Sequence, residues 1–179
     1  VTGENDRTAK QGLGLDVRAL AGKETRGYPE VSIVWEGFEK GALRGVREAG
    51  HAGGLVYLLE RDGVAPDEAR EEEPLTYPAE VDAEHIAAIG AEFDGISPDV
   101  KMLLRRGKSR FGTSKGLAER AHAVGLKVFT WTLRPESAFL ARSLRAETRA
   151  EYGQWQPWYQ AVLDLGIEGI FTDTPDLLL

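Results

Sequence analysis

The sequence has 179 residues, 42% of them hydrophobic and 28% charged, which is ordinary for one globular domain. Its formal net charge of −7 argues against non-specific nucleic-acid binding and gives no support to an anionic-membrane partner. The absence of cysteine excludes disulfides, thiolate zinc sites and cysteine nucleophiles. No apolar run approaches the roughly 18 residues of a membrane span, and the charged start lacks a signal-peptide core.

Strand-like and helix-like segments alternate through the first half of the chain. The β-branched run Val31–Trp35 predicts a buried strand, and the helical spacing of apolar residues in Phe38–Ala49 predicts a helix that Gly50 ends. A second strand is expected at Leu55–Leu59. The acidic, proline-punctuated segment Arg61–Pro78 has no periodicity and is either a variable insertion or a functional loop over a binding site.

The second half repeats this alternation. Its expected elements are a helix at Asp82–Ile89, a strand at Phe93–Ile96, a helix at Leu117–Val124, a strand at Lys127–Thr132, a helix at Tyr159–Leu165 and a strand at Ile167–Thr172. The basic cluster Arg105–Arg110 could bind phosphate, but a solvated loop is the favoured interpretation.

Five strands that alternate with helices predict a parallel α/β sheet with right-handed crossovers. A complete (β/α)₈ barrel needs about 250 residues, and five units cannot close one. Two architectures therefore remain: an open, doubly wound sheet, or the later part of a barrel.

Two motifs resemble the glycerophosphodiester phosphodiesterase family. One is GIEGIFTDTPD at Gly166–Asp176, which is similar to the family's closing strand, and the other is AHAVGLKVFTWTLRPE at Ala121–Glu136, which carries a Trp-Thr pair. The Arg-Pro-Glu end of the second motif resembles the bacterial periplasmic or secreted branch in particular. Weaker likenesses at Tyr28–Phe38 and Phe93–Pro98 occur in the family's order.

The resemblance implies an incomplete TIM (β/α)₈ barrel of the PLC-like phosphodiesterase type, containing about the last five β/α units. Residues 1–27 would then be an N-terminal extension or remnant, and residues 28–179 the C-terminal part of the domain. The family hydrolyses glycerophosphodiesters to an alcohol and glycerol 3-phosphate with Mg²⁺ or Ca²⁺. The resemblance also implies a glycerophosphodiester partner, no nucleic acid, no membrane span, and a periplasmic or secreted location.

The family's catalytic motifs are missing. The sequence has no His-Arg or His-Asp motif and no Glu-x-Asp pair on an early strand, where Gly14 stands in place of the Glu, and its three histidines, His51, His85 and His122, are expected to be structural or solvent-facing. We therefore expect the isolated chain to be inactive, because diester hydrolysis needs charge neutralisation and proton transfer. The alternative is a truncated, inactive family member that acts as a binding module or self-associates through open sheet edges.

The candidate site residues lie where the predicted strands end, at one rim of the sheet: Glu36, Glu60, Trp131, Arg134 and Asp173. Trp131 could form a wall for the glycerol or pack in the barrel core, and Arg134 could bind phosphate bidentately. Asp173 either takes part in the site or caps the turn before Pro175. Glu36 and Glu60 are the better carboxylate candidates by position.

Overall fold

The computed structural model describes residues 22–23, 25, 31–106, 111–113 and 116–178. The boundary expected between residues 27 and 28 lies outside these residues, as does most of the expected N-terminal extension. The account that follows concerns the described residues.

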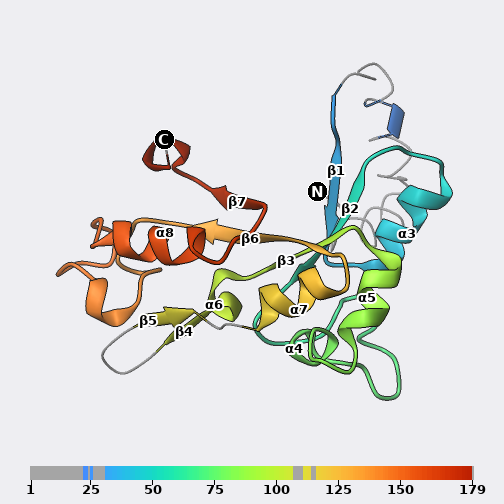
Figure 1. Cartoon of the computed structure of the whole chain (residues 1–179), viewed down its shortest axis with the longest axis horizontal. Helices are drawn as coiled ribbons and strands as arrows, with labels where there is room; N and C mark the ends of the chain where they lie inside the picture. The colour runs from blue at the N-terminus through green and yellow to red at the C-terminus, as the bar shows by residue number, and fades with distance from the viewer. Residues whose placement is uncertain (1–21, 24, 26–30, 107–110, 114–115, 179) are drawn as a thin grey trace.

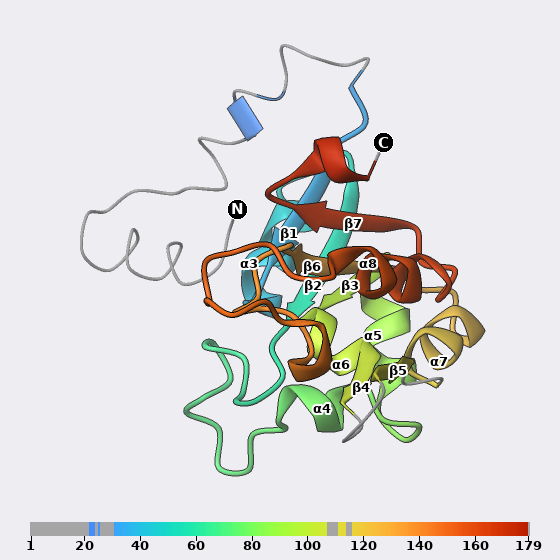
Figure 2. The same ribbon diagram turned by 90° about the vertical axis from the view of Figure 1, so that its left-hand side faces the viewer.

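Five parallel strands form the central sheet (Figure 1). They are β1 (Val34–Gly37), β2 (Gly54–Leu59), β3 (Gly95–Pro98), β6 (Lys127–Leu133) and β7 (Gly169–Thr172). Their spatial order, β1-β2-β3-β6-β7, is also their order along the chain, whereas a doubly wound sheet reverses its order at a switch point. The strand direction turns steadily from β1 to β7 (Figure 2). The sheet is therefore a curled half-barrel, and the expected incomplete TIM barrel is confirmed.

Helices follow the strands and cover the outer face of the sheet. The α-helices are α3 (Lys40–Glu48), α4 (Tyr77–Glu80), α5 (Ile86–Glu92), α6 (Val100–Leu103), α7 (Leu117–Ala123) and α8 (Trp155–Leu163). Two short 3₁₀ helices, η2 (Arg142–Leu144) and η3 (Pro175–Leu177), lie in the C-terminal part. A small antiparallel hairpin joins β4 (Leu104–Arg106) to β5 (Phe111–Thr113), so the first two residues of the basic cluster belong to a strand and not to a loop.

Alternate residues of each strand point to opposite faces of the sheet. On the outer face, one apolar core joins the strands to α3, α5 and α7 through residues that include Leu43, Leu55, Tyr57, Ile96 and Val128. A second core joins the end of β6 to α8 and to the segment between them. Each large side chain buried in this way contributes about 1.5–3 kcal/mol. The helices thus hold the sheet in its curled form.

A buried lysine attaches the acidic segment between β2 and α4 to the rest of the fold. Lys40, the first residue of α3, places its Nζ atom 2.8 Å from Glu68 Oε2 and 3.2 Å from Glu80 Oε1. The same ammonium lies 5.5 Å from the centre of the Tyr57 ring. Asp67 Oδ2 adds a 2.7 Å hydrogen bond from the Gly41 N–H. We call these contacts the Lys40 clasp, and they make this segment an ordered part of the domain.

Burial acts on the pKa values of Lys40, Glu80 and Tyr57 at the Lys40 clasp. It raises the pKa of Glu80, and the nearby Lys40 ammonium opposes that shift only in part. The pKa of Lys40 is raised although burial alone would lower it, because Glu68 and Glu80 together stabilise the charged form. Burial, followed by the Glu80 charge, raises the pKa of Tyr57 as well. The ammonium is therefore held charged between two carboxylates.

Candidate functional site

The carboxyl ends of the parallel strands meet at one rim, as they do in every TIM barrel. Glu36 lies near the end of β1, and Glu60 directly follows β2. Arg134 directly follows β6, and Asp173 directly follows β7. The structure thus places these sequence-predicted residues at the rim, and it adds Asp99, which directly follows β3.

A cavity of about 170 Å³ opens at this rim between the ends of β3 and β6. Its lining residues are Asp99, Val100, Lys101, Trp131, Thr132, Arg134 and Phe139. We call it the rim pocket. Because two cationic side chains and two aromatic rings surround it, the rim pocket suits a small anionic ligand that also has an apolar part.

Trp131 is fixed by contacts on two sides of its indole ring. Its Nε1–H donates a 2.8 Å hydrogen bond to the Ser97 carbonyl on β3. Phe38, which follows β1, meets the indole edge-on, with ring centres 5.6 Å apart. The indole is only partly buried and lines the rim pocket. Trp131 therefore both forms a wall of the rim pocket and packs against its neighbours, the two roles considered from the sequence.

Arg134 is oriented by a carboxylate and an aromatic ring. Its Nε atom lies 2.7 Å from Asp173 Oδ2, and its guanidinium carbon lies 4.8 Å from the centre of the Phe139 ring. A guanidinium has five N–H donors, so the Nε contact leaves its outer edge able to meet a bound anion. Asp173 contacts Arg134 and does not line the rim pocket itself.

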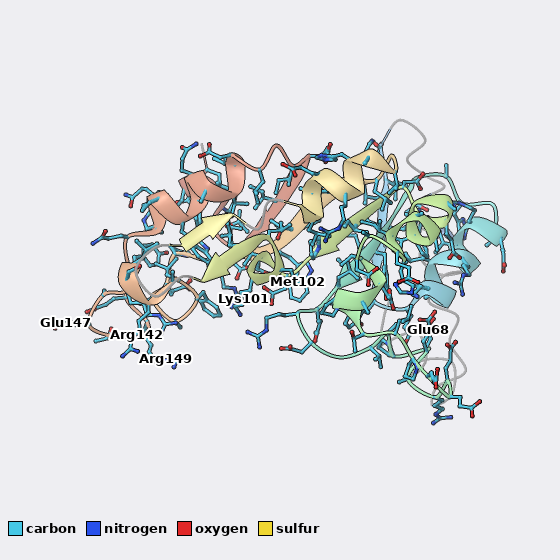
Figure 3. The ribbon with its side chains drawn as sticks, turned by 60° about the horizontal axis from the view of Figure 1, so that its bottom comes forward. Glu68, Lys101, Met102, Arg142, Glu147 and Arg149 are labelled. Carbon is cyan, nitrogen blue, oxygen red and sulfur yellow. The ribbon has the colours of Figure 1, made fainter. Side chains whose placement is uncertain are left out.

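Lys101 supplies the second cation. It lies on α6 in the middle of the molecule, in a different part from Glu68 of the acidic segment (Figure 3). Its Nζ atom is 3.9 Å from Asp99 Oδ2, while Asp99 Oδ1 accepts a 2.8 Å hydrogen bond from the Lys101 backbone N–H. Asp99 therefore caps α6 and keeps the lysine near the pocket floor.

Glu36 and Glu60 do not line the rim pocket. Burial raises the pKa of Glu36, which is half-buried on β1, and this shift favours the protonated acid compared with an ordinary glutamate. Glu60 is exposed beyond the end of β2. Within one chain, the structure brings Trp131, Arg134 and Asp173 together and leaves the two glutamates on the side of the rim formed by β1 and β2.

The described residues do not fit a Mg²⁺ or Ca²⁺ site. These cations need several oxygen ligands, and no group of three or more carboxylate or histidine side chains that could hold a metal occurs in this part of the chain. The histidines lie away from the rim pocket, as expected. His51 stacks on Trp35, His85 bonds to Asp82, and His122 on α7 lies 3.3 Å from Glu168.

The comparisons with known proteins support the fold. No model of a known protein family matches the sequence, and no curated protein sequence matches it. The crystal structure of a protein from Silicibacter pomeroyi DSS-3 is similar to this chain, with a TM-score of 0.52 and 19% sequence identity. That protein is described as a glycerophosphoryl diester phosphodiesterase. The similarity covers 95% of this chain and 44% of that chain, so this chain spans less than half of its structural relative.

The structure thus defines this protein as a half-barrel of the TIM type, with a fold similar to that of the Silicibacter pomeroyi protein. Across the described residues, no helix combines the length and the apolar character that crossing a membrane requires.

Proposed function

We propose that this chain binds a glycerophosphodiester in the rim pocket, as part of a glycerophosphodiester phosphodiesterase function. The observation that carries the proposal is the pairing of Arg134 and Lys101 with the indole of Trp131 around one cavity. A phosphodiester carries one negative charge, which the guanidinium would meet bidentately and the ammonium as a point charge. The indole would contact the carbon atoms of the glycerol. The fold of the structural relative supports this ligand class.

The proposal separates binding from bond cleavage. The two cations would neutralise charge on the phosphoryl oxygens, which is one requirement of diester cleavage. Metal-dependent hydrolysis to an alcohol and glycerol 3-phosphate also needs metal ligands and proton-transfer groups, which the described residues do not gather. We therefore expect binding without turnover by the chain alone. A periplasmic or secreted location remains part of this proposal and rests on the Arg134–Glu136 motif.

Removing the Arg134 charge is expected to weaken ligand binding about tenfold or more, because a hydrogen bond to a charged group contributes about 1.5–3 kcal/mol. Isothermal titration of glycerophosphocholine into wild type and Arg134→Met measures the loss. Arg142→Met is the matched control, since Arg142 is exposed on η2 and lies outside the rim pocket. Equal affinities for wild type and Arg134→Met would overturn the assignment of the pocket.

A parallel assay follows glycerol 3-phosphate release with Mg²⁺, with Ca²⁺ and with a chelator. We expect no release above background in any of the three. Rapid metal-dependent release would contradict the separation of binding from cleavage, because the chain would then supply its own catalytic groups.

A further inference from the structure

The half-barrel has two open edges in the described part of the chain. β1 pairs only with β2, and β7 pairs only with β6, so each edge strand presents one row of backbone N–H and C=O groups. Soluble proteins usually protect such edges with lysine, proline or a covering segment. The sequences of these strands, VWEG and GIFT, contain one charged residue and no proline between them. Glu36 on β1 is the one residue of these two strands that is of a kind that hinders edge pairing.

The inner face of the sheet carries apolar side chains that are most exposed at these same two strands. Val34 on β1 is 48% exposed and Phe171 on β7 is 41% exposed. Phe129 and Trp131 share this face through the alternation along β6, and both are only partly buried. In a closed barrel, side chains at these positions fill the interior. An apolar face of this kind is expected to be covered.

We propose that a second copy of this chain covers the inner face, with a two-fold axis along the barrel axis. In this arrangement β7 of each copy pairs in parallel with β1 of the other copy. One symmetry operation then satisfies both edges at once, and the contact closes after two copies. In the structural relative, this fold belongs to a chain of which the match covers 44%.

The pairing also changes the candidate site. Because every strand keeps the same direction, the carboxyl ends of both sheets lie at the same rim. At the joint, β7 lies beside β1 of the partner copy. Asp173, with Arg134 bound to it, then lies on the side of the rim where Glu36 of the partner copy stands near the end of β1. Glu36 of the partner copy then lies on the strand next to Asp173, the carboxylate that orients Arg134. This inference stands without the proposed ligand and is tested separately from it.

Sedimentation equilibrium of the full chain measures the mass in solution. We expect twice the 19.6 kDa of one chain, and dissociation to folded monomers for Val34→Lys and for Phe171→Lys. The charge in either variant would be buried at the joint at a cost of several kcal/mol. Leu163→Lys is the matched control because Leu163 is 50% exposed on α8, outside both edge strands, and this variant should remain dimeric. Circular dichroism checks that each variant keeps its fold.

Cross-linking identifies which edges meet. Since the chain lacks cysteine, Val34→Cys and Phe171→Cys each carry a single thiol. A short bismaleimide should link the two variants when they are mixed and should link neither variant alone. A monomer at high concentration, open-ended oligomers, or a dimer unaffected by both lysine variants would overturn the proposal. Linking of either variant alone would overturn it as well, because like edges would then be adjacent.

Discussion

Replacing Lys40 with methionine is expected to lower the free energy of unfolding by about 3–5 kcal/mol, the usual cost of removing one partner from a buried ion pair. The Lys40 side chain is 9% exposed and that of Glu80 is 1% exposed. Methionine fills the space but leaves two carboxylates facing each other without a cation. Urea unfolding at fixed protein concentration measures the change. Lys101→Met is the matched control and should cost less than about 1 kcal/mol, because the Lys101 ion pair is long and partly exposed.

The deficit of Lys40→Met should depend on pH. Burial already holds the pKa of Glu80 above its value in the unfolded chain. For a carboxyl with a raised folded pKa, folding is penalised above that pKa, and the penalty disappears as pH falls through it. Removing Lys40 raises this pKa further, so the difference between variant and wild type should be smaller at pH 5 than at pH 7. The double variant Lys40→Met/Glu80→Gln should recover part of the loss at pH 7. A deficit that is equal at both pH values would contradict the role assigned to Glu80.

Replacing Gly53 with alanine is expected to cost about 3 kcal/mol. Gly53 has a φ of +125°, which L side chains rarely adopt, and an added Cβ would lie 2.6 Å from the Ile33 carbonyl oxygen. That carbonyl already accepts a hydrogen bond from the Gly54 N–H where β1 and β2 meet, so moving it would disturb the pairing of the two strands. The strained backbone contributes about 1–3 kcal/mol, and the steric overlap adds a comparable amount.

Gly63→Ala is the control for Gly53→Ala. Gly63 also has a positive φ, +96°, but an added Cβ there would have no atom within 4 Å. Its substitution should therefore cost only the backbone strain. Thermal unfolding of both variants measures the difference. Equal losses of stability would show that the contact with Ile33 has no role of its own.

The alternation of strands and helices could be predicted from the sequence, but several of their boundaries could not. β2 and α7 lie close to the expected positions because their apolar runs end at clear stop signals. The prediction for the first strand began three residues early, since the apolar residues before Val34 have no parallel partner on β2. The prediction for the last helix began four residues late. Pro157 lies in the first turn of α8, where proline is tolerated, so the helix begins at Trp155.

The candidate site was predictable only in part, and the reason is spatial. Position near or just after the end of a strand identified Trp131, Arg134 and Asp173, and the same rule would also have identified Asp99. Lys101 and Phe139 reach the rim pocket because β3 and β6 are neighbours and the chain after β6 folds back, which no local pattern encodes. The Lys40 clasp was also missed, since its carboxylates lie within an acidic segment that has no periodicity.

The order of the strands has a kinetic consequence. Because each strand pairs only with the strands next to it in the chain, local opening can begin at either end without breaking the middle, as in a repeat protein. In a copy that is not paired with a second one, such as the Phe171→Lys variant, amide hydrogen exchange should therefore be fastest in β1 and β7 and slowest in β2 and β3. Asp173 orients Arg134 from just beyond β7, so the rim pocket depends on one of the two strands that open first. A partner that pairs with the free edge of β7 would therefore also prolong the lifetime of the contact between Asp173 and Arg134, and with it the anion-binding geometry of the rim pocket.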